Sequence, residues 1–175
     1  MITGENFIGF ERSAMGDRTY STFNPKLNIE NSEVFHEATE QEIEDAVSKA
    51  KDAFSDYYQM SGTRKAQFLN TIADEIMDLD DELISVYCRE SGLPEGRAKG
   101  ERGRTVFQLR SFAELVAKGD WVEATIDSAQ PERKPLPKPD IRKMNIPLGP
   151  VVVFGASNFP LAYSTAGGDT ASALA

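Results

Sequence analysis

Asn158 is the residue whose surroundings in the sequence point most directly to catalysis. It follows the segment 150–155, an uninterrupted apolar run that is typical of a strand buried on both faces of a parallel sheet. In α/β proteins, ligands bind beside the carboxyl ends of such strands. A side-chain amide placed there can donate to a developing oxyanion, and one such donor contributes about 3 kcal/mol of transition-state stabilisation. Asparagine also serves as a plain turn residue, so the residue type leaves both interpretations open.

Cys88 and His36 are the single cysteine and histidine of the chain, so any Cys–His or Ser–His pair would have to include His36. Cys88 falls near the end of an expected helix, where the helix dipole disfavours a thiolate, and we interpret it as structural. His36 has no evident partner in the sequence and is interpreted in the same way. The acidic stretch 74–82 lacks the glycine and the spacing of a calcium loop, so we expect a solvated helix face.

The segment Gly100-Glu101-Arg102-Gly103-Arg104 is unusual because it places two glycines within a helical pattern. Each costs roughly 1 kcal/mol against alanine, which suggests the close approach of another segment. Arg102 and Arg104 could then offer guanidinium groups to a carboxylate or a phosphate. The alternative is a pair of surface arginines beside a glycine that serves helix packing.

Composition excludes several classes of function. The 175 residues carry 28 acidic and 19 basic side chains, and a net charge of −9 disfavours nucleic-acid binding. A single cysteine cannot form an internal disulfide, which favours a reducing, cytoplasmic location. No apolar run approaches the roughly 18 residues of a membrane span, and the first residues do not resemble a signal peptide.

The hydrophobic pattern predicts an α/β protein that is mostly helical in its first part. We expect a strand pair within residues 6–24, with its turn at 15–17. Four helices should follow, the first opened by a capping box at Thr39–Glu42 and the last two closed by Gly92 and Gly119. Their apolar positions lie within residues 43–57, 68–77, 83–87 and 106–116.

The remaining sequence predicts an arm and an unfinished βα unit. Two strands, 121–127 and 141–146, flank a proline-rich basic connection, which we expect at a sheet edge or on a projecting arm; a solvated loop is the alternative. The buried strand 150–155 should lead through a turn into a helix over 161–175, with Gly167 and Gly168 inside it. No Gly-rich phosphate loop or Walker lysine is present in the sequence. A parallel strand without a neighbour indicates the front part of a longer protein.

Three motifs resemble those of the aldehyde dehydrogenase superfamily: Phe23-Asn24-Pro25, Glu90-Ser91-Gly92-Leu93-Pro94, and Asn158-Phe159-Pro160 after the apolar run. The resemblance covers essentially the whole chain. The segments 135–142, 154–162 and 166–175 are similar to the branch that contains α-ketoglutaric semialdehyde (2,5-dioxopentanoate) dehydrogenases and NADP-dependent long-chain fatty aldehyde dehydrogenases. Ala156-Ser157 replaces the Pro-Trp of most of the superfamily, which supports that branch.

The resemblance implies specific roles. Asn158 matches the side-chain donor of the oxyanion hole. The substrate tunnel would be walled by Phe159 and Tyr163, with Arg104 holding a distal carboxylate. The cofactor would lie beside Phe154, Gly155, Ala156 and Ser157.

The resemblance also implies a domain plan and a function. Residues 1–120 and 147–175 match an incomplete Rossmann-type cofactor domain, and 121–146 match the arm that joins subunits in homo-oligomers. The catalytic cysteine, the general base and the Gly-rich cofactor turn lie beyond Ala175 in relatives, so this segment alone should be inactive. We expect the N-terminal part of an enzyme that oxidises 2,5-dioxopentanoate with NADP, or with NAD. A fatty aldehyde dehydrogenase and a short non-catalytic interaction module are the alternatives.

Overall fold

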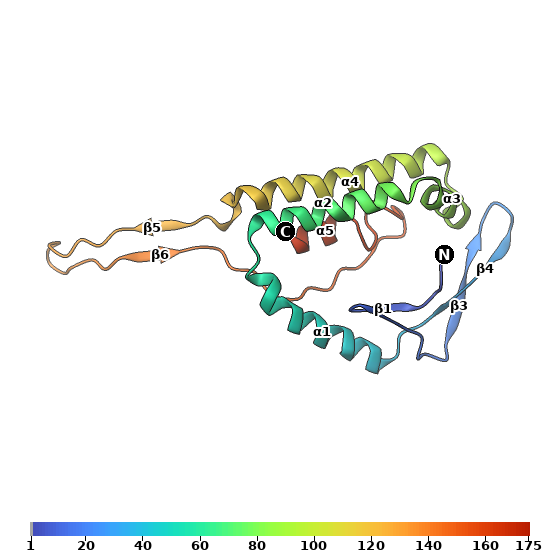
Figure 1. The fold of residues 1–175 in the computed structure, drawn as a ribbon, viewed down its shortest axis with the longest axis horizontal. Helices are drawn as coiled ribbons and strands as arrows, with labels where there is room; N and C mark the ends of the chain where they lie inside the picture. Colours follow the sequence, from blue (N-terminus) through green and yellow to red (C-terminus); the bar gives the residue numbers. More distant parts are fainter. Residues whose placement is uncertain (1) are drawn as a thin grey trace.

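The computed structural model describes residues 2–175 and shows a helical body, a β region near the N-terminus and a long two-stranded arm (Figure 1). The helices are α1 (Glu40–Tyr58), α2 (Gly62–Asp78), α3 (Asp80–Ser91), α4 (Glu95–Lys118) and α5 (Gly168–Leu174), with a 3-10 turn η1 (Asp120–Val122). The strands are β1 (Asn6–Ile8), β2 (Glu11–Ser13), β3 (Thr19–Asn24), β4 (Ile29–His36), β5 (Thr125–Asp127) and β6 (Ile141–Lys143). No helix within residues 2–175 combines the length and the apolar character needed to cross a membrane.

The helix ends follow the predicted signals. At the start of α1, the Thr39 hydroxyl accepts from the Glu42 amide and the Glu42 carboxylate accepts from the Thr39 amide, which confirms the capping box. The left-handed residues Gly92 (φ 70°) and Gly119 (φ 75°) end α3 and α4, and glycine adopts this conformation without a Cβ clash. The four predicted helices are confirmed.

The main core lies between α2 and α4 and is closed by α5 (Figure 1). Its buried members are Ala66, Leu69, Ala73, Val106, Leu109, Ala113, Val116 and Ala171. A smaller cluster of Ile84, Tyr87 and Ala98 joins α3 to α4. The predicted apolar face of α4 is therefore confirmed, and α4 is the element against which the C-terminal segment packs.

The prediction of close packing at Gly100 and Gly103 is wrong. A Cβ at either position would meet nothing within 4 Å, because this side of α4 faces open space. The close approach occurs at Gly62 instead, where a Cβ would lie 2.0 Å from the Val116 carbonyl oxygen. Glycine at the start of α2 therefore lets that helix lie against the end of α4.

The N-terminal strands pair differently from the prediction. β1 forms a hairpin with β2, while β3 pairs antiparallel with β4, so the turn at 15–17 does not join a strand pair. The chain reverses earlier than predicted, at Gly9 (φ 66°), a conformation that glycine adopts readily. The predicted apolar stripe of α1 also stays largely exposed, with Ile43 at 53% and Val47 at 55%, because within residues 2–175 little packs over it.

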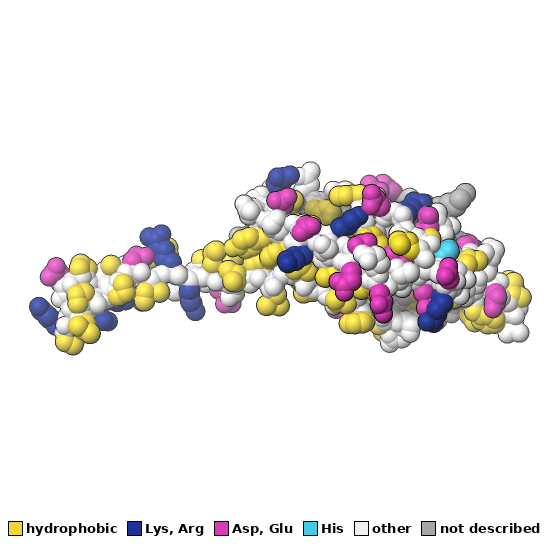
Figure 2. Space-filling model, turned by 90° about the horizontal axis from the view of Figure 1, so that it is seen from below, with side chains coloured by type: hydrophobic (Ala, Val, Ile, Leu, Met, Phe, Trp, Pro, Cys, Tyr) yellow, Lys and Arg dark blue, Asp and Glu magenta, His cyan; other side chains and the backbone are white. Residues whose placement is uncertain are grey.

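The arm projects away from the helical body (Figure 1). Among the described residues, β5 and β6 pair only with each other, which confirms the interpretation of a projecting arm. Hydrophobic side chains gather along the arm and where it meets the body (Figure 2). Ile126, Leu136 and Ile141 of the arm are 51–69% exposed. This much exposed apolar surface is typical of a contact region.

The prediction of a buried parallel strand at 150–155 is wrong for this structure. The segment is extended but unpaired, and Val152 and Phe154 are 76% and 85% exposed. A strand requires hydrogen-bonded neighbours, and no segment of residues 2–175 lies in register beside this one. The helix predicted over 161–175 is also shorter, because residues 156–167 form successive turns and α5 begins only at Gly168. Gly167 therefore caps the helix rather than lying within it.

Candidate functional site

Asn158 lies on the exposed turn that follows the apolar segment. Two backbone hydrogen bonds shape the turn: the Ala156 amide donates to the Tyr163 carbonyl at 2.7 Å, and the Phe159 amide donates to the Ala156 carbonyl at 3.3 Å. The carbonyl of Asn158 accepts from the Arg97 guanidinium of α4 at 3.2 Å. The backbone of Asn158 is thus fixed against α4 while the residue remains accessible. We call residues 156–167 the Asn158 loop.

Three residues that the sequence assigned to substrate binding lie together. Arg104 of α4 donates to the Tyr163 hydroxyl at 2.6 Å, and its guanidinium lies 5.0 Å from the Tyr163 ring centre and 5.7 Å from that of Phe159. The two rings meet edge to face, with centroids 5.5 Å apart. A helix residue and a loop some 60 positions later in the chain therefore form one aromatic and cationic cluster.

A small hollow opens beside this cluster. It has a volume of about 230 Å³. Its lining comes from α4, the Asn158 loop and α5: Arg104, Gln108, Phe112, Ala162, Tyr163, Gly168, Asp169 and Ser172. Arg104 and Tyr163 border both the aromatic cluster and this hollow, so an acidic group that enters it would meet a guanidinium.

The four residues predicted to border the cofactor, 154–157, are all exposed; Phe154 and Gly155 precede the Asn158 loop, and Ala156 and Ser157 begin it. They do not end a strand, because the segment 150–155 has no paired neighbour within residues 2–175. After the Phe154 ring, the next three side chains are no larger than serine, and a Cβ at Gly155 would first meet the Tyr163 carbonyl oxygen at 3.5 Å. The backbone of this segment is therefore accessible from the surface.

Glu101 is the main feature of the region that sequence reasoning missed. Its side chain is buried within α4 and accepts from the Tyr87 hydroxyl at 2.8 Å and from Arg97 Nε at 2.7 Å. Its second oxygen accepts from the backbone amides of Leu161 and Ala162. Arg97 and Glu101 are four residues apart on a helix, which was the available signal, but that spacing alone is typical of an exposed ion pair.

The surroundings of Glu101 shift two pKa values. Burial raises the pKa of Glu101, but the hydrogen bonds from Arg97, Leu161 and Tyr87 outweigh it and hold the pKa below its ordinary value. The pKa of Tyr87 rises to about 12, first because of burial and then because of its hydrogen bond to Glu101. Glu101 is therefore an ionised carboxylate and Tyr87 a neutral donor near neutral pH.

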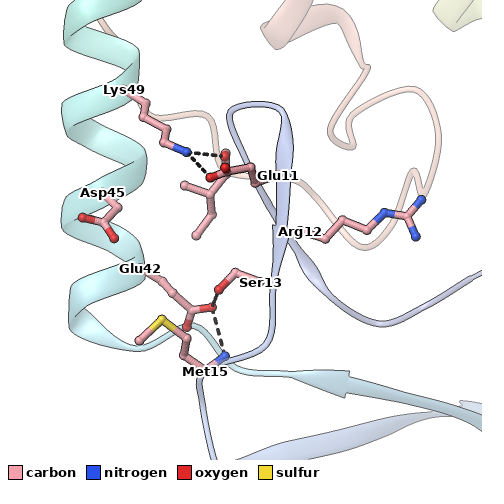
Figure 3. A pocket seen from close by; sticks show the side chains of 8 residues that line it. Glu11, Arg12, Ser13, Met15, Glu42, Asp45 and Lys49 are labelled. Carbon is pink, nitrogen blue, oxygen red and sulfur yellow. Dashed lines mark hydrogen bonds and ion pairs between the residues drawn. The ribbon is translucent and has the colours of Figure 1, made fainter.

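A larger hollow of about 520 Å³ lies between α1 and the β1–β2 hairpin (Figure 3). Lys49 reaches across it to the Glu11 carboxylate at 2.9 Å and to the Ile8 carbonyl at 3.1 Å. Glu42 accepts from the Ser13 hydroxyl at 2.5 Å and from the Met15 amide at 3.2 Å, and Arg12 points away from α1. The charged groups that face α1 are thus engaged in holding the hairpin to the helix.

Glu42 makes this attachment sensitive to acid. The Ser13 hydroxyl and the backbone amides of Thr39 and Met15 lower the pKa of Glu42 to about 2, from an ordinary value of 4.5. Because folding lowers this pKa, the unfolded chain binds the proton more readily. The stabilisation is therefore complete above about pH 4.5 and is lost as the pH falls toward 2.

Glu42→Gln in the full-length protein should accordingly flatten the acid side of the stability profile. We expect the wild-type protein to lose thermal stability between about pH 5 and pH 3, and the variant to lose less over the same interval. Thermal unfolding followed by circular dichroism at a series of pH values measures this. Glu44→Gln, which changes an exposed carboxylate of the same helix, is the control and should follow the wild-type profile. Identical profiles for wild type and Glu42→Gln would contradict the assignment.

Cys88 and His36 occupy structural positions, as predicted. Cys88 packs, half-buried, against the small α3–α4 cluster. His36 lies in β4, with Nδ1 at 3.3 Å from the Gly16 carbonyl oxygen. Asp74, in the acidic stretch, forms an exposed ion pair with Arg110 at 2.8 Å. Among residues 2–175, no three His, Cys, Asp or Glu side chains gather closely enough to hold a metal ion.

A family profile and the similar curated proteins agree on the family to which this chain is related. The Aldehyde dehydrogenase family profile matches residues 11–175. The chain is 51% identical to Alpha-ketoglutaric semialdehyde dehydrogenase 2 of Azospirillum brasilense over 99% of its own length and 33% of the relative's. It is 46% identical to Alpha-ketoglutaric semialdehyde dehydrogenase of Acinetobacter baylyi over 98% of its own length and 33% of the relative's. The chain thus spans about a third of these curated relatives.

The fold is similar to solved structures as well. The crystal structure of HpcC from Thermus thermophilus superposes with a TM-score of 0.80 at 22% identity. The match covers 99% of this chain and 32% of that one. The crystal structure of aldehyde dehydrogenase 21 from Physcomitrella patens superposes with a TM-score of 0.78 at 20% identity, over 92% of this chain and 32% of that one, which confirms the aldehyde dehydrogenase-like fold expected from the sequence.

Proposed function

This chain belongs to the aldehyde dehydrogenase family, and we propose that it forms the N-terminal part of an enzyme that oxidises 2,5-dioxopentanoate (α-ketoglutaric semialdehyde) to 2-oxoglutarate. The observation that carries the proposal is the 51% identity, across 99% of this chain, to a relative named for that substrate. Because the chain spans a third of that relative, the activity belongs to a protein in which this segment is joined to the rest of the enzyme.

Asn158 is the proposed catalytic group within this segment. As the substrate carbonyl is attacked, its oxygen becomes negative, and the Asn158 amide donates a hydrogen bond that stabilises this charge without a proton transfer. The anchored backbone and the exposed position of the residue support the role. The attacking nucleophile and the general base come from the part of the enzyme outside this segment.

Arg104, Phe159 and Tyr163 are the proposed substrate-binding residues. The two rings wall the substrate tunnel, and the Arg104 guanidinium binds the distal carboxylate of the dioxopentanoate. Arginine presents five N–H donors in a planar fork that matches a carboxylate. The Tyr163 hydroxyl accepts one of these hydrogen bonds at 2.6 Å and helps to orient the side chain. The hollow beside the cluster supports this role.

Residues 154–157 are the proposed border of the cofactor site, with NADP as the cofactor and NAD as the alternative. The exposed backbone and the small side chains after Phe154 suit contact with a flat ring. When bound, the cofactor would supply the acceptor for the hydride that the substrate loses. Residues 154–157 would hold the ring beside the Asn158 loop.

The proposed domain plan follows the sequence expectation. Residues 1–120 and 147–175 contribute to the cofactor-binding domain, and the arm of 121–146 joins subunits in a homo-oligomer. The projection of the arm and its exposed apolar side chains support this assignment (Figures 1 and 2).

The proposal is tested with the purified full-length protein, 2,5-dioxopentanoate and either NADP or NAD. We expect reduced cofactor and 2-oxoglutarate to form in equal amounts, measured by absorbance and by mass spectrometry. The 175-residue segment alone should form neither. Absence of both products from the full-length protein, with either cofactor, would overturn the proposal.

A further inference from the structure

The buried carboxylate of Glu101 joins α3 and α4 to the Asn158 loop, which lies some 60 residues later in the sequence. Within α4 it is 4% exposed, and it accepts four hydrogen bonds. Oε1 accepts from Tyr87 of α3 and from Arg97 of α4, whereas Oε2 accepts from the amides of Leu161 at 3.0 Å and Ala162 at 3.4 Å. Two of its four bonds therefore go to the backbone of the Asn158 loop.

Arg97 extends the attachment to the other side of Pro160. Its guanidinium donates to the Asn158 carbonyl at 3.2 Å and lies 4.7 Å from the centre of the Phe159 ring. Glu101 in turn accepts from Arg97 Nε at 2.7 Å and so fixes the direction of that side chain. The loop is held before Pro160 through Arg97 and after it through Glu101 itself.

The negative charge of Glu101 is required for this arrangement. All four groups around the carboxylate are donors, and an ionised carboxylate offers only acceptor sites. Glutamine has one acceptor oxygen, and its NH₂ group would face either the two loop amides or the Tyr87 and Arg97 donors. A buried donor without an acceptor is costly, so the loop or Arg97 would have to move.

We propose that Glu101 is a positioning residue that holds the side-chain amide of Asn158 in place for the aldehyde oxidation proposed above. The inference rests on that proposed function, because the effect on the reaction passes through the oxyanion donor. A donor must be held within about 0.5 Å of its productive position, and a misplacement of about 1 Å can cost about 10²-fold in rate. Glu101 touches neither the substrate nor the cofactor in this scheme.

The kinetic test compares Glu101→Gln with Glu114→Gln in the full-length protein. Glu114 is an exposed carboxylate of the same helix that accepts from Lys118 at 2.7 Å, so the two substitutions are chemically identical. We expect Glu101→Gln to lower kcat by about tenfold or more, with the KM for the cofactor unchanged, and Glu114→Gln to match wild type. An unchanged kcat in Glu101→Gln would overturn the inference.

A double-mutant cycle separates positioning from a general loss of structure. If Glu101 acts through Asn158, the Glu101→Gln change should cost little further kcat once Asn158→Ala is present. A merely structural role predicts the same fold-loss in both backgrounds, and that result would overturn the inference.

Hydrogen–deuterium exchange tests the attachment without reference to activity. The Leu161 and Ala162 amides should exchange at least about tenfold faster in Glu101→Gln and at the wild-type rate in Glu114→Gln. If the wild-type protein oxidises no aldehyde but these amides respond as expected, the proposed function fails while the attachment stands. Unchanged exchange in Glu101→Gln would overturn the attachment itself.

Discussion

Asn158→Ala should lower kcat for 2,5-dioxopentanoate oxidation by the full-length protein about 10²- to 10³-fold, the usual cost of losing one oxyanion donor. The loss should fall on kcat and on kcat/KM alike, because the hydrogen bond strengthens only as charge develops on the carbonyl oxygen. The KM for the aldehyde should change little. Steady-state kinetics with saturating cofactor measures all three quantities.

Asn145→Ala provides the matched control. Asn145 is an exposed asparagine at the root of the arm, and its side chain donates to the Trp121 carbonyl at 3.2 Å. It lies outside the proposed site, so this variant should retain the kcat of wild type. A loss smaller than about threefold for Asn158→Ala would contradict a role in stabilising the oxyanion.

Arg104→Ala should raise the KM for 2,5-dioxopentanoate by about 10- to 100-fold, because a hydrogen bond to a charged group contributes about 1.5–3 kcal/mol. The KM for an uncharged alkyl aldehyde should change far less, since that substrate has no distal carboxylate. The ratio of the two KM changes therefore isolates the charge interaction from any distortion of Phe159 and Tyr163. It is measured by steady-state assays of both substrates with one enzyme preparation.

Arg110→Ala is the control for this experiment. Arg110 is an exposed arginine of α4 that pairs with Asp74 at 2.8 Å, away from the Asn158 loop. It should leave both KM values unchanged. Equal KM increases for the two substrates in Arg104→Ala would exclude a carboxylate-binding role.

Local sequence signals predicted the helical body well because each acts within a few residues. The capping box at Thr39 and the left-handed glycines at 92 and 119 need only their own neighbours, and the structure confirms all three. The apolar spacing of α4 likewise identified its buried face. These features are independent of the rest of the chain.

Features that depend on distant partners were predicted poorly. The apolar run 150–155 has the pattern of a buried strand, but a strand forms only where neighbours supply its hydrogen bonds, and within residues 2–175 none does. The hairpin pairing was wrong for a related reason, since β3 finds its partner in β4. Periodicity indicates which residues suit a strand, and it does not identify the partner.

In the candidate site, too, the sequence identified some residues and missed one that depends on distant partners. The residue types and the family resemblance selected Arg104, Phe159 and Tyr163, and the structure brings them together. Glu101 was missed because its partners at 161 and 162 are backbone amides, and every residue type except proline has one, so the sequence does not identify them. A buried acid with backbone partners becomes visible only when the loop and the helix are seen in contact.

The most direct test of the account is the ratio of kcat/KM for 2,5-dioxopentanoate to that for a long-chain alkyl aldehyde, measured with the full-length protein and NADP. We expect the dioxopentanoate to be preferred by at least about tenfold, the value of one charged hydrogen bond at Arg104. A preference for the alkyl aldehyde would contradict the account and favour a fatty aldehyde dehydrogenase.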